Sequence, residues 1–364
     1  MLVRLSNILK FIVITIFAAV FLTAVAFASA NRGTQTGISE PEILTVADAV
    51  KYAAERSTEL KNLDENEYLN ELNRAALERS RIESYNEGQH VNALVSIMQN
   101  ELRQASFSDN ITLQRLIIEF SVTRYFAAII AVERDLSLYD RNLALSKANL
   151  DIAEVRMELG MMSKNAFDSL KLTYDKDTAN REGKVIAADN AYRALNGVMG
   201  KELSKRYILE MDIEYEPLGD TDLTRYILSS VKENVAIKNR ENDLTLAKYR
   251  LELANGEKET EEREIGASQA MRALDDAKKD FEDKIISCYK DIQNLEMQYS
   301  AAVNEYTDML SQLSVMETQF ELGGLTRLDI DMYEYQMAML EYRILSLIND
   351  HYIKKMQFMN PDLL

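Results

Sequence analysis

The sequence carries one heptad pattern of apolar residues twice. In the first copy, apolar side chains recur every seven residues from Val122 to Met157, and a second row follows three residues behind. In the other copy the same pattern runs from Ile285 to Phe320. Rows spaced by three and four positions line one face of an α-helix, and about four such heptads already indicate a coiled coil. The chain is therefore predicted to consist of two similar halves built from long helices.

Both heptad patterns end in the same kind of turn. Glycine at Gly160 and Gly323 can adopt the left-handed conformation that stops a helix. Three residues later, the hydroxyls of Ser163 and Thr326 can cap the next helix. Each half is thus predicted to end in a helical hairpin, with returning helices over about 164–197 and 327–358. Three prolines in 364 residues fit such long uninterrupted helices.

We divide the chain into five segments. Arg4 and Lys10 precede an apolar run and two A-x-A sites, which predicts a signal peptide and export to the cell envelope. An uncleaved membrane anchor is the alternative. The predicted segments are 1–30 signal peptide, 31–44 flexible linker, 45–205 helical repeat 1, 206–220 inter-repeat connector and 221–360 helical repeat 2.

Several local expectations follow within these segments. Thr45 is predicted to cap a short helix ending near Arg56. Long helices are expected over 59–104 and 111–159, with a break at 106–110. The stretch Leu209–Tyr215 alternates apolar and acidic residues, which predicts the one strand. The predicted fold class is all-α: long antiparallel coiled-coil hairpins in two tandem repeats, with at most a short strand.

The two halves match in two different alignments. At their starts, Leu60-Lys61-Asn62 corresponds to Ile237-Lys238-Asn239, and we call this the start alignment. At their tips, Glu158 corresponds to Glu321, in step with the heptad rows, and we call this the tip alignment. The two alignments disagree by fourteen positions, so the halves differ in length between start and tip.

Charge and residue types exclude several functions. The net charge of −17 argues against binding to nucleic acid and to anionic membrane surfaces. His90 and His351 lie far apart, and no cluster has metal-ligand spacing. Cys288 lies on the second heptad seam and is expected to be a buried, small apolar residue. We therefore expect no metal, no cofactor, no catalytic residue and no enzymatic activity.

The hairpin turns also resemble those of a known family. The residues Phe320 to Asp329 follow the pattern aromatic or Arg, x, x, Gly, x, x, Ser or Thr, x, x, Asp or Asn. The first turn departs from it at Ala166, where the acidic residue would stand. Tyr125-Phe126 and Cys288-Tyr289 occupy equivalent places near the starts of the long helices. Together with the duplication, these features make the chain similar to the TolC-like outer membrane efflux protein family.

The resemblance implies a homotrimer enclosing a helical tunnel that docks with a periplasmic adaptor and an inner-membrane transporter. It also implies an acidic ring near the tunnel entrance, for which Asp329 is the candidate; the alternative is that Asp329 only complements the start of its helix. The candidate tip residues are Gly160, Ser163, Gly323, Thr326 and Asp329.

One departure leaves a second function open. The family places β-hairpins between its long helices, but the corresponding segments 106–110 and 255–268 are too short or too charged for lipid-facing strands. The alternative is thus a coiled-coil scaffold of the envelope without a β-barrel or transport. A tunnel requires a second apolar face on the helix from Ile111. The apolar positions that indicate such a face are Leu116, Phe120, Phe126, Ile130, Leu138 and Leu145.

Overall fold

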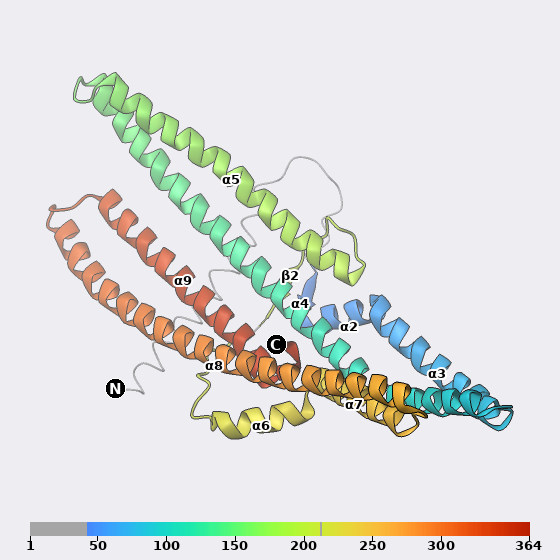
Figure 1. The fold of residues 1–364 in the computed structure, drawn as a ribbon. Coiled ribbons are helices and arrows are strands. Elements are labelled where there is room, and N and C mark those ends of the chain that lie inside the picture. Colours follow the sequence, from blue (N-terminus) through green and yellow to red (C-terminus); the bar gives the residue numbers. More distant parts are fainter. Residues whose placement is uncertain (1–41, 212) are drawn as a thin grey trace. The chain divides into compact units, whose positions relative to one another are not determined.

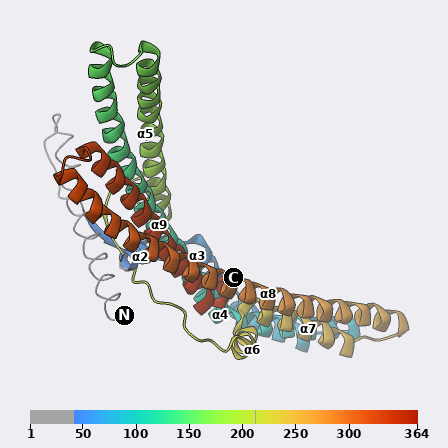
Figure 2. The same ribbon diagram turned by 90° about the vertical axis from the view of Figure 1, so that its left-hand side faces the viewer.

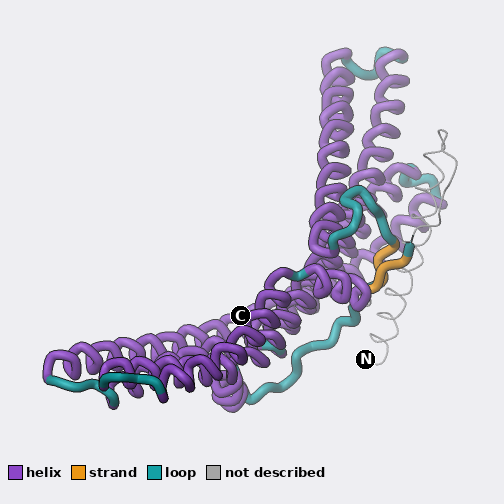
Figure 3. The backbone as a smooth tube through the Cα atoms, turned by 90° about the vertical axis from the view of Figure 1, so that its right-hand side faces the viewer, coloured by secondary structure: helices purple, strands orange, loops and turns teal. Residues whose placement is uncertain are grey.

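The computed structural model describes residues 42–211 and 213–364, and the predicted signal peptide lies outside them. Residues Ile43–Leu364 form a compact unit of their own. Its helices are α2 (Val46–Arg56), α3 (Thr58–Ile82), α4 (Glu87–Glu158), α5 (Lys164–Met199), α6 (Leu223–Glu233), α7 (Val235–Glu252), α8 (Glu257–Glu321) and α9 (Arg327–Met359). The other described elements are the strands β1 (Ile43–Thr45) and β2 (Ile208–Glu210) and the short 3-10 helix η1 (Pro361–Leu363). Helices dominate the unit, which confirms the predicted all-α fold (Figures 1 and 3). None of these helices is both long enough and apolar enough to qualify as a membrane span.

The same order of helices occurs twice along the chain. Two helices of 11 residues, α2 and α6, open the two halves, and each is followed by a helix, a very long helix and a returning helix. The first residues of α2 and α6 correspond in the start alignment, and the last residues of α4 and α8 correspond in the tip alignment. The disagreement between the two alignments has a simple origin. Helix α3 has 25 residues against 18 in α7, and α4 has 72 against 65 in α8, so each helix of the first pair is longer by one heptad.

Two antiparallel hairpins, α4 with α5 and α8 with α9, use the predicted seams (Figure 2). Val122 and Ile129 of α4, and Ile285 and Ile292 of α8, are almost completely buried. Burial of an aliphatic side chain of this size contributes about 1.5–3 kcal/mol. Cys288 is also buried on the seam, and this burial raises the pKa of its thiol. The heptad interpretation is confirmed for both halves.

The predicted break at 106–110 is wrong, because α4 runs through it without interruption. The side chains of Ser106 and Thr112 donate to carbonyl oxygens three or four residues earlier in the same helix, and Asn110 does so at 2.8 Å. Such local bonds allow polar residues to remain helical. The chain turns instead at residues 83–86. In the second half, α8 begins at Glu257, so most of the segment 255–268 is helix.

The single predicted strand is also corrected. Residues Ile208–Glu210 form β2, but the strand stops well before Tyr215, and it pairs in parallel with β1, Ile43–Thr45. Strand β1 lies at the end of the segment expected to be a flexible linker. Leu44 is buried against the core of the first half, which holds this short strand in place. Thr45 caps α2 through Asp48, as predicted.

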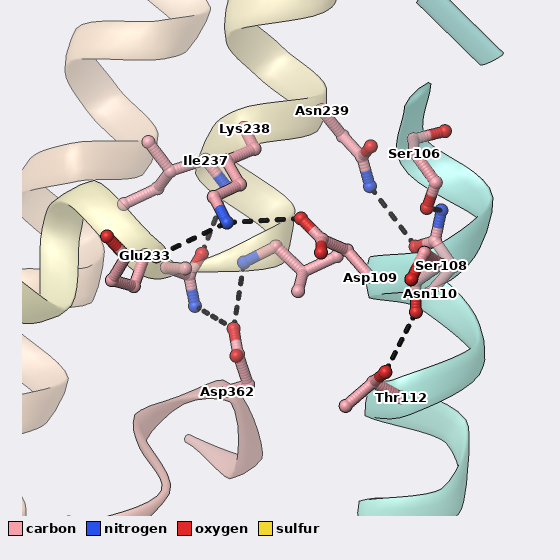
Figure 4. Close-up of polar contacts among 12 residues, drawn as sticks. Ser106, Ser108, Asp109, Asn110, Thr112, Glu233, Ile237, Lys238, Asn239 and Asp362 are labelled. Carbon is pink, nitrogen blue, oxygen red and sulfur yellow. Dashed lines mark hydrogen bonds and ion pairs between the residues drawn. The ribbon is translucent and has the colours of Figure 1, made fainter. Parts of the chain in front are cut away.

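A cluster of polar contacts joins the halves (Figure 4). Lys238 Nζ of α7 lies 3.1 Å from Asp109 Oδ2 of α4. The hydrogen bond to Asp109 is the main cause that raises the pKa of Lys238. At the C-terminus, the Asp362 carboxylate accepts hydrogen bonds of 2.8 Å from Asn234 Nδ2 and from the Val235 N–H, the first of α7. Asp362 therefore supplies an acceptor for a buried backbone N–H at the start of α7.

The seam of the second half offers a stability test. Ile292 is 0% exposed. Ile292→Ala is expected to lower the free energy of unfolding by about 2–5 kcal/mol, because it leaves a cavity. Leu322→Ala is the control, since Leu322 is 82% exposed. Truncation of such a surface side chain should change stability by about 0.5 kcal/mol or less. Urea unfolding of residues 43–364, followed by circular dichroism, measures both, and equal small effects would contradict the burial of Ile292.

Candidate functional site at the hairpin tips

Both hairpins close with the same backbone geometry. After α4, Gly160 has φ 72°, its N–H donates to the Met157 carbonyl at 3.0 Å, and the Met161 N–H donates to the Arg156 carbonyl at 2.8 Å. This pair of bonds is the Schellman arrangement, in which a left-handed glycine ends a helix. After α8, Gly323 has φ 78° and makes the equivalent bond to the Phe320 carbonyl. The two predicted glycine stops are confirmed.

The returning helices begin at the predicted caps. The Ser163 side chain accepts from the Ala166 N–H at 3.3 Å, and the Thr326 side chain accepts from the Asp329 N–H at 3.3 Å. Asp329 also returns a bond: its Oδ2 accepts from the Thr326 N–H at 2.7 Å and from the Thr326 hydroxyl at 2.6 Å. This is a complete capping box. Its counterpart is missing at the first tip, where Ala166 has no carboxylate.

The capping box determines the electrostatics of Asp329. The bonds from the Thr326 hydroxyl and then from its N–H lower the pKa of the Asp329 carboxyl. Asp329 is exposed and therefore remains charged near neutral pH. Its contribution to the cap is present above the usual pKa of a carboxyl and is lost as the pH falls through the lowered value. Capping and a charge facing an entrance are compatible roles for one carboxylate.

The five candidate residues lie in two groups, one at each tip. Gly160 and Ser163 belong to the α4–α5 turn, and Gly323, Thr326 and Asp329 belong to the α8–α9 turn.

Contacts between α4 and α9 show how the hairpins are matched within the unit. Arg134 of α4 pairs with Glu341 of α9. Arg141, closer to the first tip, pairs with Glu334, closer to the second. The two helices are thus antiparallel, and both tips lie at the same end of the paired hairpins.

These ion pairs were not expected from the sequence. Arg134 Nη2 lies 3.3 Å from Glu341 Oε2, and Arg141 Nη2 lies 2.8 Å from Glu334 Oε2. The partners are far apart in the chain, and no short motif joins them. The sequence does contain one feature that could have indicated these pairs: the two arginines are one heptad apart, and so are the two glutamates. Opposite charges repeated at the heptad spacing indicate neighbouring helix faces.

The tips offer exposed apolar surface. Leu159, Met161 and Leu322 are large apolar side chains exposed around the two turns. Within the residues that the structure describes, no three His, Cys, Asp or Glu side chains are grouped so as to hold a metal ion. The chemistry available at the tips is therefore apolar contact and carboxylate charge.

The difference between the two caps gives a second test. Ala166→Asp would supply the missing half of a capping box at the first tip, and we expect it to stabilise the protein by about 0.5–1 kcal/mol at neutral pH. The control is Ala179→Asp, an exposed position in the middle of α5 that should gain nothing. Thermal unfolding at pH 7 and at pH 3 measures both. The gain should be smaller at pH 3, where protonation of the new carboxyl begins. A gain shared by the control would contradict the capping argument.

Comparison with known proteins supplies a context for this geometry. No family model and no curated protein matches the sequence. Among solved structures, the chain is similar to the CmeC outer membrane channel of Campylobacter jejuni, with a TM-score of 0.67 and 8% identity over 87% of this chain and 85% of that one. It is also similar to the outer membrane protein VceC of Vibrio cholerae, with a TM-score of 0.65 and 10% identity over 87% of this chain and 96% of that one.

A further similar structure is the MtrE outer membrane channel of Neisseria gonorrhoeae, with a TM-score of 0.54 and 10% identity over 90% of this chain and 95% of that one. All three are described as outer membrane proteins or channels rather than as enzymes. Identities this low establish a common architecture. At that level the resemblance expected from the sequence is confirmed: the chain has the fold of the TolC-type outer membrane efflux channels.

Proposed function

We propose that this protein is the helical conduit component of an export system in the cell envelope. In this proposal it acts without catalysis, assembles as a homotrimer and uses its hairpin tips to dock with a periplasmic adaptor and an inner-membrane transporter. The observation that carries the proposal is the duplicated hairpin fold shared with outer membrane channels over most of the chain. The packing of the two repeats within one chain supports the assembly.

The long helix of the first repeat packs against the second repeat, but the corresponding side of the long helix of the second repeat is uncovered. Helix α4 packs on α5 of its own repeat and on α7 and α9 of the other repeat. Helix α8 packs on α6, α7 and α9, and within the described residues it has no comparable packing against α3 or α5. The side of α8 that corresponds to the α9-facing side of α4 is therefore uncovered. The sides of α3 and α5 that correspond to the α4-facing sides of α7 and α9 are also uncovered. These surfaces form the two edges of the chain. A second copy could join α8 to α3 and α5 in the way that α4 joins α7 and α9.

A contact of this kind is head-to-tail and closes into a ring if the rotation is suitable. Three chains would place six similar repeats around one axis. The exposed side of α3 fits this arrangement. Leu69 and Leu72 of α3 are exposed, whereas their counterparts in the start alignment, Leu246 and Tyr249 of α7, are half-buried. The face of α7 that includes Asn239 contacts α4 inside the chain, and in the described residues no second long helix packs on the same face of α3.

The apolar face predicted for a neighbouring chain needs correction. Leu138 is buried within the chain, on the stripe between Arg134 and Arg141 that faces α9, and Phe126 belongs to the core around α2 and α5. Leu138 and Phe126 are therefore no evidence for a contact with a neighbouring chain.

The equivalent stripe of α8 is more polar. Ala301 and Asp308 correspond to Leu138 and Leu145 in the tip alignment, and both are exposed. Contacts between chains are thus expected to be weaker than the contacts between repeats. This polar flank also favours the second candidate function, a coiled-coil scaffold that binds a partner through its tips and conducts nothing.

Mutation of the α8 flank separates the two functions. Residues 43–364 are expected to form a trimer, and Ala301→Arg should shift the population to smaller species because the side chain would stand in the interface. Leu310→Arg is the control, since Leu310 is exposed and the helical repeat places it on the opposite side of α8 from Ala301. Light scattering after size exclusion, over a range of concentrations, measures the mass. A monomer at every concentration would contradict the conduit and support the scaffold.

The role of Asp329 is tested by removal of its charge. Asp329→Asn keeps a side-chain oxygen for the Thr326 N–H but removes the carboxylate. If Asp329 faces an entrance, the variant should change the cation selectivity of single channels in a planar bilayer, in the direction of fewer cations. Asp220→Asn, at an exposed position of the connector between the repeats, is the matched control. Unchanged selectivity in both would leave Asp329 with its capping role alone and would contradict the entrance proposal.

A further inference from the structure

The hairpin of α3 and α4 ends in a segment that has no counterpart in the second repeat. Helix α7 ends at Glu252, which corresponds to position 75 in the start alignment. Helix α8 begins at Glu257, which corresponds to position 94 in the tip alignment. The turns at 83–86 and 253–256 are equally long, so residues 76–93 contain one extra heptad in each helix. We call residues 76–93 the extension.

Packing between α3 and α4 contributes little to stability within the extension. A groove of about 650 Å³ between the two helices is lined mainly by small and polar side chains, among them Ala76 and Ser80 on α3 and Ala93 and Ser96 on α4, with Leu77 as its aliphatic residue larger than alanine. Such an interface buries little apolar area, so it contributes little to stability.

Two large side chains of the extension stay exposed, although Tyr85 borders the groove. Ile82 is 75% exposed and Tyr85, in the turn, is 94% exposed. The extension therefore presents an aliphatic and an aromatic side chain to its surroundings at the end of a weakly packed hairpin.

A second copy of the chain does not cover these two residues. In the assembly proposed above, the neighbouring α8 would run beside α3, but α8 is a heptad shorter than α4 and begins at Glu257. Ile82 and Tyr85 therefore lie beyond its start. They are exposed in the single chain and would remain so in the ring, which leaves them available for a different partner.

We propose that the turn of the extension binds the interfacial region of a lipid bilayer. An aliphatic residue beside a tyrosine suits this region, where the tyrosine ring meets the acyl chains and its hydroxyl stays among the head groups. Arg79 and Arg81 precede the turn in the last part of α3, where Arg81 Nε lies 3.1 Å from Glu78 Oε2. Both side chains are long enough to extend toward phosphates while their stems cover apolar surface.

The charge of the extension also fits a bilayer. The extension has two arginines against three glutamates, so it is nearly neutral in a chain of net charge −17. The α7–α8 turn is different, because the sequence from Glu257 to Glu264 contains five glutamates against Lys258 and Arg263. Of the two neighbouring hairpin ends, α3–α4 and α7–α8, the extension is therefore the one that meets less repulsion at a membrane. Lipids of zero net charge should suffice for binding.

A fluorescent reporter can test the position directly, because the chain contains no tryptophan. In residues 43–364, which form a compact unit without the predicted signal peptide, Tyr85→Trp would introduce the only tryptophan. Its emission is expected to move to shorter wavelength when phosphatidylcholine vesicles are added. Met161→Trp, at the opposite end of α4 and also highly exposed, is the control and should not respond. An unchanged emission from the Tyr85→Trp variant, or an equal shift in the control, would overturn the proposal.

Flotation with the same vesicles tests the residues as they occur in the chain. The unsubstituted protein should float with the lipid, and Ile82→Asp should lower the partition coefficient by about tenfold, since partial burial of an isoleucine is worth about 1.4 kcal/mol. Ile82 is exposed, so circular dichroism should show unchanged helix content in the variant. A protein that does not float, or a variant that floats equally well, would contradict the proposal. Flotation can be measured on the monomer or on the trimer, whichever light scattering shows. Absence of lipid binding is therefore distinguishable from absence of trimer formation.

Discussion

The burial of α4 on two sides is the constraint on which the rest of the structure depends. One side of this helix carries the heptad seam that packs on α5, and another carries Leu138 between two arginines that pair with glutamates of α9. This second contact, together with the packing of α4 on α7, defines how the two hairpins lie relative to each other. Because the arginines and the glutamates are each separated by one heptad, only one register satisfies both pairs at once.

The heptad also limits how the repeats can diverge. The extension adds one heptad to α3 and one to α4, which keeps every seam residue on its original face of the helix. An insertion of five or six residues would have rotated the seam away from its partner. The Asn70–Asn100 pair reinforces the register, because the two buried amides bond to each other and to backbone oxygens across the α3–α4 interface. Length in this fold therefore changes in whole heptads, and function can be added at the ends of hairpins without loss of the core.

The sequence predicts most where one repeating interaction determines the structure. The seams, the glycine stops at Gly160 and Gly323 and the caps at Ser163 and Thr326 depend on local geometry, and they were predicted at the correct residues. The break at 106–110 was misplaced because polar side chains that favour turns can also bond within a helix. Strand β1 is too short to show alternation, and its place depends on the burial of Leu44. The role of Asp329 in the cap was one of two open alternatives, and only the geometry at Thr326 shows the bonds.

The two edges of the chain, α8 on one and α3 with α5 on the other, connect this architecture to the proposed conduit. Electron microscopy of residues 43–364 at concentrations that favour assembly tests this connection most directly. Our account predicts closed rings that look nearly sixfold in projection, because each of three chains contributes two similar repeats. Isolated hairpin pairs, or open filaments in which the head-to-tail contact fails to close, would contradict it.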